Sequence, residues 1–89
     1  MIKVRVRFSG LFADIAGKES EEISVPNGTC LNNFIKIVLA NNRSLGEWYD
    51  KVPYIQIFLN GVEATGREAQ SCLNEGDEVT LSPPLHEGG

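Results

Sequence analysis

Apolar and polar residues alternate without a break at the start of the chain. Ile2, Val4, Val6 and Phe8 fall on one side of an extended segment, and Lys3, Arg5 and Arg7 fall on the other. This period of two predicts a half-buried strand over residues 2–8. A second alternating stretch, residues 21–25, stops at a proline, and we expect it to pair with the first as an antiparallel ribbon. Residues 11–16 are expected to form a short helical turn that ends at Gly17.

The apolar spacing becomes that of a helix after Asn27-Gly28. One helical face carries apolar residues at the i, i+3, i+4, i+7 and i+8 positions, namely Leu31, Phe34, Ile35, Val38 and Leu39. We expect Thr29 to be the N-cap and the helix to end near residues 41–42. It is the only long helix that the pattern predicts. Residues 43–53 have no clear period, so we expect an irregular connection that Trp48 and Tyr49 anchor to the body.

Alternation returns in the C-terminal half. Residues 54–59 are predicted to be a strand with Ile55, Ile57 and Leu59 inward, and Asn60-Gly61 indicates a hairpin with a short return over residues 62–64. Residues 65–75 are expected to be a loop with one turn near residues 69–73. The last predicted strand, residues 78–82, has Val79 and Leu81 inward. It stops at Pro83-Pro84, because proline cannot donate to a hydrogen-bond ladder.

The order strand, strand, helix, strand, short strand, strand predicts an α+β fold. The economical arrangement is a mixed sheet of four to five strands with one main helix packed on one face. The same order is found in the ubiquitin-like β-grasp fold, in which the first and last strands run parallel at the centre of the sheet. We therefore expect a β-grasp domain over residues 1–84, followed by a flexible C-terminal tail over residues 85–89.

Composition narrows the classes of function. A chain of 89 residues predicts one domain, and a net charge of −4 argues against binding to a nucleic acid backbone. The apolar runs are too short to span a bilayer, so no membrane partner is expected. The chain begins directly with a strand pattern, which predicts no signal peptide and a cytoplasmic location.

The cysteines and the single histidine provide no recognisable metal site. Cys30 and Cys72 form no CxxC pair, and together with His86 they do not make a zinc set, so neither a metal nor another cofactor is predicted. We expect both cysteines to be reduced packing residues, although the sequence leaves a Cys30–Cys72 disulfide open. Cys30 is expected near a helix N-terminus, where a thiolate would be favoured, but we prefer to interpret it as a small buried packing residue.

The C-terminal Gly88-Gly89 has two readings. A glycine pair is slim enough for another protein to close around it and to capture its carboxylate. Alternatively it is a frayed end, since termini are often disordered. Pro83-Pro84 would both end the strand and stiffen the exit of the tail, which lowers the freedom lost on insertion. His86 is expected to contact a partner or to have no role, rather than to act as a base.

Several segments of the chain resemble a known family, the ubiquitin-like sulfur carriers. The resemblance is to the small subunit of molybdopterin synthase (MoaD-like), and more distantly to the thiamine-pathway carrier (ThiS-like) and to archaeal small modifiers. The matching segments run through the whole chain: residues 8–17 (FSGLFADIAG), residues 58–61 (FLNG), residues 73–79 (LNEGDEV), Ser82-Pro83-Pro84 and Gly88-Gly89.

The resemblance implies a specific chemistry and specific partners. An ATP-dependent activating enzyme of the ubiquitin-activating type adenylates Gly89, and a sulfur donor then converts it to a thiocarboxylate. Gly88, Pro83, Pro84 and Leu85 would serve recognition of the tail by the large subunit, the acceptor in molybdenum cofactor biosynthesis. The chain itself would be a carrier and not an enzyme. The alternatives are a modifier joined to lysines through Gly89, a carrier for thiamine or tRNA thiolation, and a plain interaction domain.

A partner surface is also expected on the outer face of the sheet. If Ile57 and Leu59 face the helix, Phe58 faces outward with Tyr54, and an exposed aromatic suggests an interface. The alternative is that the aromatic loop around Trp48 covers it. The stripe that includes Arg5 and Arg7 is either a solvated face paired with Glu78 or a docking surface for an acidic partner.

Overall fold

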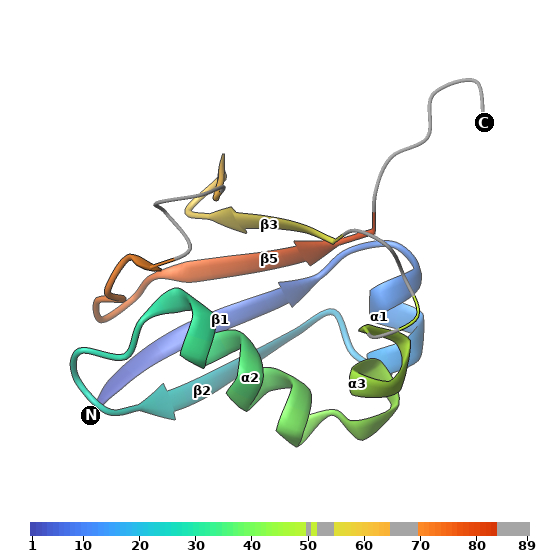
Figure 1. The fold of residues 1–89 in the computed structure, drawn as a ribbon, viewed down its shortest axis with the longest axis horizontal. Helices are drawn as coiled ribbons and strands as arrows, with labels where there is room; N and C mark the ends of the chain where they lie inside the picture. Colours follow the sequence, from blue (N-terminus) through green and yellow to red (C-terminus); the bar gives the residue numbers. More distant parts are fainter. Residues whose placement is uncertain (50, 52–54, 65–69, 84–89) are drawn as a thin grey trace.

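The computed structural model describes residues 1–49, 51, 55–64 and 70–83 (Figure 1). Its elements are β1 (Ile2–Phe8), α1 (Leu11–Ala16), β2 (Ser20–Val25), α2 (Leu31–Asn41), α3 (Arg43–Tyr49), β3 (Gln56–Leu59), β4 (Val62–Glu63) and β5 (Glu78–Ser82). The five strands form one mixed sheet in the order β2-β1-β5-β3-β4. The predicted α+β fold, with a mixed sheet and one main helix on one face, is confirmed.

The first and last strands lie side by side at the centre of the sheet. β1 pairs with β2 in antiparallel register from Ile2↔Val25 to Arg7↔Ser20, as predicted. On its other side β1 runs parallel to β5, with Val6 opposite Val79 and Phe8 opposite Leu81. Apart from the half-buried Ile2, the inward side chains of β1 and β5 are almost completely buried. The two strands therefore supply a large part of the hydrophobic core.

One face of the sheet carries the helices and the core. α2 lies across this face, and α1 and α3 pack together near the end of β1 (Figure 1). The core combines the inward residues of the strands with the apolar sides of the helices. Its fully buried members include Val4, Val6, Phe12, Val25, Leu31, Phe34, Val38, Leu45, Val79 and Leu81. Ile55, Ile57 and Leu59 also pack against the core, as predicted, but they stay half-buried.

Residues 43–53 are not simply an irregular connection, and that expectation is wrong for Arg43–Tyr49, which form α3. Seven residues that include a glycine are too few for a period to be recognised. The helix is held by packing: Leu45 is buried, and a Cβ on Gly46 would lie 3.4 Å from the carbonyl oxygen of Leu39. Glycine at this position therefore allows α3 to approach the end of α2 closely.

The predicted N-cap of α2 is also wrong. The cap residue is Cys30, which makes no side-chain capping hydrogen bond. The Thr29 hydroxyl instead donates to the carbonyl oxygen of Pro26 at 2.7 Å, and so it closes the preceding turn. A hydroxyl that can bond locally in a turn competes with its own capping role. The turn around Asn27-Gly28 takes the hydroxyl, and the helix begins one residue later than the sequence suggests.

The Asn60-Gly61 hairpin forms as predicted between β3 and β4. Asn60 and Gly61 have φ angles of 53° and 85°, the combination of a primed two-residue turn. Asn60 also binds the start of β5: its Oδ1 accepts from the Glu78 amide at 2.9 Å, and its Nδ2 donates to Asp77 at 3.1 Å. The hairpin is therefore tied to the central strand as well as to itself.

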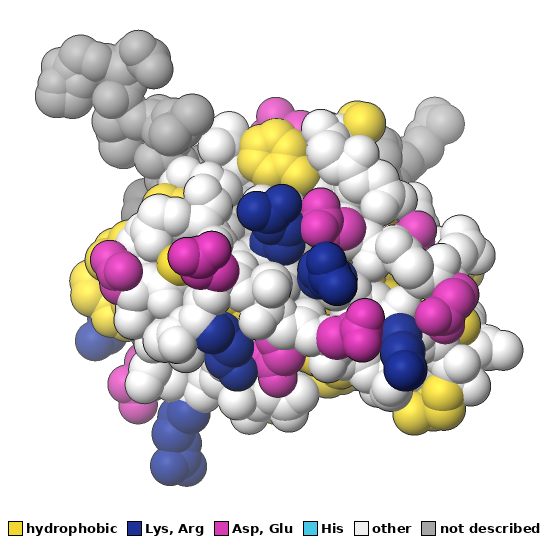
Figure 2. Space-filling model, turned by 180° about the vertical axis from the view of Figure 1, so that it is seen from behind, with side chains coloured by type: hydrophobic (Ala, Val, Ile, Leu, Met, Phe, Trp, Pro, Cys, Tyr) yellow, Lys and Arg dark blue, Asp and Glu magenta, His cyan; other side chains and the backbone are white. Residues whose placement is uncertain are grey.

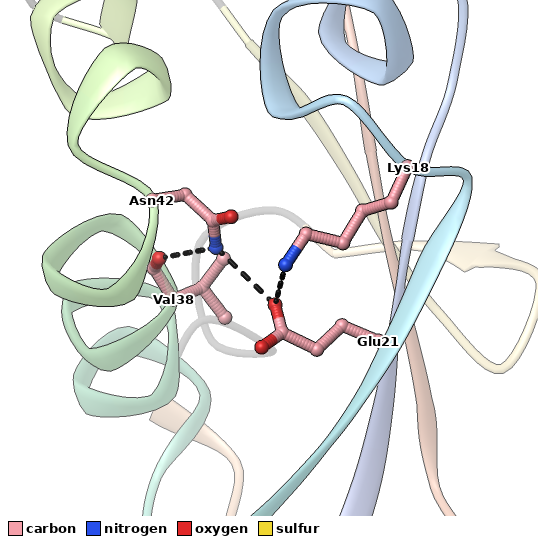
Figure 3. A network of polar contacts seen from close by, with 4 residues as sticks. All are labelled: Lys18, Glu21, Val38 and Asn42. Atoms are coloured by element: carbon pink, nitrogen blue, oxygen red, sulfur yellow. Dashed lines mark hydrogen bonds and ion pairs between the residues drawn. The ribbon is translucent and has the colours of Figure 1, made fainter.

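A buried asparagine closes α2 and connects it to β2 (Figure 3). The Asn42 amide nitrogen Nδ2 donates to the Val38 carbonyl oxygen at 2.9 Å and to Oε1 of Glu21 at 3.3 Å. The same Oε1 lies 3.1 Å from Nζ of Lys18. Because Asn42 is only 9% exposed, water cannot readily replace these partners.

Replacing this asparagine gives a first test of the fold. We expect Asn42→Ala to lower the free energy of unfolding by about 1–2 kcal/mol, because it removes two hydrogen bonds, one of them to the Val38 carbonyl oxygen. Urea unfolding followed by circular dichroism measures the change. The matched control is Asn41→Ala, at an exposed position one residue earlier, which should change stability by less than about 0.5 kcal/mol. Equal effects at the two positions would show that the buried network contributes nothing.

Candidate functional site

The face of the sheet opposite the helices is an open surface of mixed character. Figure 2 shows this face with a hydrophobic side chain beside a cluster of basic and acidic ones. The pleat of the strands decides which side chains lie here. Since Val79 and Leu81 point into the core, Thr80 between them points outward, as do its cross-strand partners.

Phe58 lies on this outer face, as predicted. It stands opposite Thr80 of β5 and opposite Glu63 of β4, and Thr80 in turn stands opposite Arg7 of β1. Phe58, Thr80 and Arg7 thus form one cross-strand row. We call this row, together with Arg5, the outer-face row. Phe58 is half-buried and Arg7 is exposed, so a flat partner could contact an aromatic ring and a guanidinium together.

Trp48 does not cover Phe58. Trp48 belongs to α3, which packs against α1 and α2 on the helical side of the sheet, and its side chain is 41% exposed there. Cover of Phe58 by Trp48 is therefore wrong, and residues 50 and 52–54 of the predicted aromatic loop lie outside the described residues. Tyr54, the other aromatic predicted on this surface, lies outside the described residues.

The basic stripe is balanced by acidic neighbours. Arg5 stands opposite Glu22 on one side and Glu78 on the other, and Nη1 of Arg7 lies 4.0 Å from Oε2 of Glu78. The predicted pairing of the stripe with Glu78 is confirmed for Arg7. That pair is more than a third exposed on both sides, so it stabilises the fold little and stays available to a partner.

The exit of the chain from β5 is fixed by the turn between β1 and α1. The Ser9 amide donates to the Leu81 carbonyl oxygen at 3.0 Å, which extends the parallel pairing past the end of β1. Gly10 adopts a φ of 57°, and a Cβ placed on it would lie 3.6 Å from the Pro83 ring. Pro83 is half-buried against this turn. The turn therefore sets the direction in which the chain leaves the sheet.

A hollow of about 420 Å³ adjoins this exit. Its lining includes Arg7 and Thr80 of the outer-face row, together with Ser9, Gly10 and Glu19. Because β1 and β5 run parallel, their C-terminal ends lie at the same end of the sheet, and Arg7 and Thr80 lie near that end. The outer-face row, which is the predicted interface, therefore adjoins the place where the chain leaves β5. The remaining predicted tail residues, Pro84, Leu85, Gly88 and Gly89, and also His86, lie outside the described residues.

The two cysteines lie elsewhere, and their surroundings differ from the expectation. Cys30 is half-buried and Cys72 is exposed, so neither is a buried packing residue; both are free thiols, as expected. They face one another in an isolated antiparallel bridge, a proximity that their distance in sequence does not reveal. Partial burial, then a hydrogen bond with Cys72 and its charge, raise the pKa of the Cys30 thiol. A thiolate favoured by the helix N-terminus is therefore wrong for Cys30.

Among the residues that the structure describes, no group of three or more His, Cys, Asp or Glu side chains is placed to hold a metal ion. Within the same described ranges, the helices are all too short or too polar to cross a bilayer.

Comparison with known proteins gives matches in structure. No protein-family model and no curated protein sequence matches the chain. Small archaeal modifier protein SAMP1 from Haloferax volcanii matches with a TM-score of 0.83 and 19% identity, over 97% of this chain and 99% of that one. A putative molybdopterin converting factor subunit 1 from Pyrococcus furiosus matches with a TM-score of 0.78 and 23% identity, over 96% and 100%.

A third match is a complex. The protein–protein complex of subunits 1 and 2 of molybdopterin-converting factor from Helicobacter pylori contains a chain that matches with a TM-score of 0.67 and 26% identity, over 98% of this chain and all of that one. The matches confirm the resemblance that the sequence motifs predict. The chain has the ubiquitin-like β-grasp fold that it shares with molybdopterin-converting factor subunit 1 and the small archaeal modifier proteins.

Proposed function

We propose that this chain is a ubiquitin-like sulfur carrier that works in the cytoplasm. Its Gly89 carboxylate attacks the α-phosphorus of ATP on an activating enzyme, which releases pyrophosphate and leaves an acyl-adenylate. Hydrosulfide from a sulfur donor then attacks the acyl carbon, forms a C–S bond, expels AMP and leaves a thiocarboxylate. The acceptor is the large subunit of a molybdopterin synthase, which uses the sulfur in molybdenum cofactor biosynthesis. The chain is a co-substrate, and its partners are the catalysts.

The observation that carries the proposal is the direction of β5. The central strand β5, parallel to β1, ends at Ser82, next to the outer-face row, and the six residues printed after Pro83 include Gly88-Gly89. A carboxylate is a poor electrophile, so it needs an enzyme that closes around the chain end, and two glycines give that enzyme the least obstruction. The likeness to subunit 1 in the complex from Helicobacter pylori supports a large subunit as the acceptor.

The direct test is the mass of the intact protein. The full chain is incubated with ATP, a sulfur donor and a candidate activating enzyme from the same organism. We expect a mass gain equal to the exchange of one oxygen for sulfur, localised to Gly89 by fragmentation. Omission of ATP should abolish the gain, because the carboxylate is then never activated. An unchanged mass with every activating enzyme of the organism would refute the carrier function.

A protein modifier is the second candidate, and the likeness to SAMP1 favours it. It shares the adenylation step, but the amine of a lysine, rather than sulfur, takes the acyl group. Digestion of cell extracts with trypsin distinguishes the two functions if an Arg is first introduced before Gly88, as Glu87→Arg. Conjugation would leave a Gly-Gly remnant on substrate lysines that is absent from cells lacking the gene.

Phe58 provides a test of the outer-face row as the partner surface. We expect Phe58→Ala to weaken binding to the large subunit by about 10- to 30-fold, since an aromatic anchor at an interface is worth about 1–2 kcal/mol. Calorimetric titration of the two purified proteins measures the affinity. The ring is half-buried on the outer face, so the variant should keep its fold.

The matched control for Phe58 is Val62→Ala on the adjoining hairpin strand. Val62 is 67% exposed and stands opposite Leu59, which places it on the other side of the sheet from Phe58. The control should bind like the wild type. If Phe58→Ala also binds the large subunit with wild-type affinity, the outer-face row is not part of the interface.

A further inference from the structure

We propose that Cys30 and Cys72 are a thiol–disulfide redox pair. A low-molecular-weight disulfide oxidises them to an intramolecular bond that joins the start of α2 to the segment before β5. This proposal does not depend on the chemistry at Gly89.

The backbone already holds the two cysteines in a geometry that fits a disulfide. They face one another in an antiparallel bridge, and the flanking hydrogen bonds run from the Leu31 amide to Ser71 and from the Leu73 amide to Thr29, both at 2.9 Å. The hydrogen bonds therefore lie beside the pair and not within it. In this type of pair the Cα atoms are about 4.5 Å apart, within the range of about 4.4–6.8 Å that disulfides span.

The core fixes both sides of this bridge. Leu31 follows Cys30 and is fully buried, and Leu73 follows Cys72 and is 3% exposed. Each cysteine is thus attached to a leucine that cannot move without opening the core. Partial burial, followed by the neighbouring Cys72 side chain, raises the pKa of the Cys30 thiol, which agrees with the pairing of the two residues in the bridge. Oxidation needs little backbone movement.

The unequal exposure of the thiols sets the order of the reaction. Cys72 is exposed, so its thiolate can attack an external disulfide, break the S–S bond and release one thiol. The half-buried Cys30 then attacks the Cys72 sulfur of the mixed disulfide and releases the second thiol. Overall the two cysteines lose two electrons and two protons, and the external disulfide gains them. Reduction by excess thiol reverses both steps.

The bond would act far from the tail exit. The Gly76 amide donates to the Lys3 carbonyl oxygen at 2.9 Å, which places the segment before β5 at the start of β1. Ser9 and Pro83 lie at the other end of the same strands. Figure 1 shows α2 beginning beside the N-terminus, at the end of the sheet away from the end of β5. Oxidation should therefore stabilise the domain without blocking the exit of the chain.

The experiment treats the reduced full chain with oxidised glutathione. We expect a monomer lighter by two hydrogens, a peptide in which Cys30 is linked to Cys72, and a thermal midpoint raised by roughly 10 °C, because the bond closes a long loop of the unfolded chain. Dithiothreitol should restore the starting mass and midpoint. The matched controls are Cys30→Ser and Cys72→Ser, and the first should accumulate a glutathione adduct on the exposed Cys72.

Several results would overturn the redox pair. They are stable glutathione adducts on the wild-type chain, disulfide-linked dimers, no reaction, and an oxidised monomer in which no peptide links Cys30 to Cys72. A linked monomer with an unchanged or lower thermal midpoint would keep the redox pair but contradict the expected stabilisation, since the bond would then strain the bridge. Serine replaces each thiol at an exposed or half-buried position, so both control variants should fold.

Discussion

Phe12→Ala is expected to destabilise the domain by about 3–5 kcal/mol, the usual cost of removing a phenylalanine from a packed core. Phe12 is fully buried, although α1 is only six residues long and contributes just this one fully buried side chain. A small domain has a total stability of roughly 5–15 kcal/mol, so the variant should lose a large share of it. Chemical unfolding followed by fluorescence of Trp48 measures the loss.

The effect of Phe12 should extend to the tail exit. α1 packs against β1, β5 and α3, and the Phe12 amide donates to Ser9 at 3.2 Å. Loosening α1 therefore releases the turn that holds Leu81 and Pro83. Hydrogen exchange should show faster exchange of the Ser9 amide, which donates to Leu81, even under conditions where the rest of β1 stays protected.

Leu11→Ala is the matched control for this core prediction. Leu11 belongs to the same helix but is 44% exposed, so the substitution should cost less than about 1 kcal/mol. A loss of less than about 1 kcal/mol in Phe12→Ala would contradict the packing, because it would mean that the cavity collapses at no cost.

Sequence reasoning succeeded where the signal is local and periodic. β1 and β5 alternate so regularly that their buried faces follow from the pattern alone, and their central place followed from the order of elements shared with the β-grasp fold. The hairpin followed from Asn60-Gly61 because only a few residue pairs adopt two consecutive positive φ angles. The outward side of Phe58 then followed from the pleat of the strand.

Sequence reasoning failed where tertiary contacts determine the local structure. α3 has no readable period, and it forms because Leu45 enters the core and Gly46 fits against α2. Thr29 is a good cap by propensity, but a turn took its hydroxyl. The Cys30–Cys72 bridge joins two residues that are far apart in the sequence, and no local motif near either cysteine predicts their contact. In each case the local sequence does not reveal which other segment of the chain contacts the residue.

Deleting Gly89 is expected to abolish sulfur loading. The new end would be Gly88, which still has a slim shape and a carboxylate, so only the reach changes. One residue spans about 3.5 Å, and a misplacement of even about 1 Å at a reacting group can cost about 100-fold in rate. We therefore expect a loss of at least about 100-fold, measured as ATP-dependent thiocarboxylate formation by intact mass.

His86→Ala is the control that distinguishes the effect of a shorter tail from a general effect of changing the tail sequence. It alters a residue near the end but keeps both glycines and the length, so loading should stay within a few-fold of wild type. Both variants should unfold at the wild-type urea concentration, because β5 and the core that the structure describes lie before residue 84. Should the chain lacking Gly89 load sulfur as fast as the full chain, position would not matter, and the carrier proposal would fail. Should His86→Ala be as inactive as the deletion, the histidine, which we assign no chemical role, would belong to the reaction.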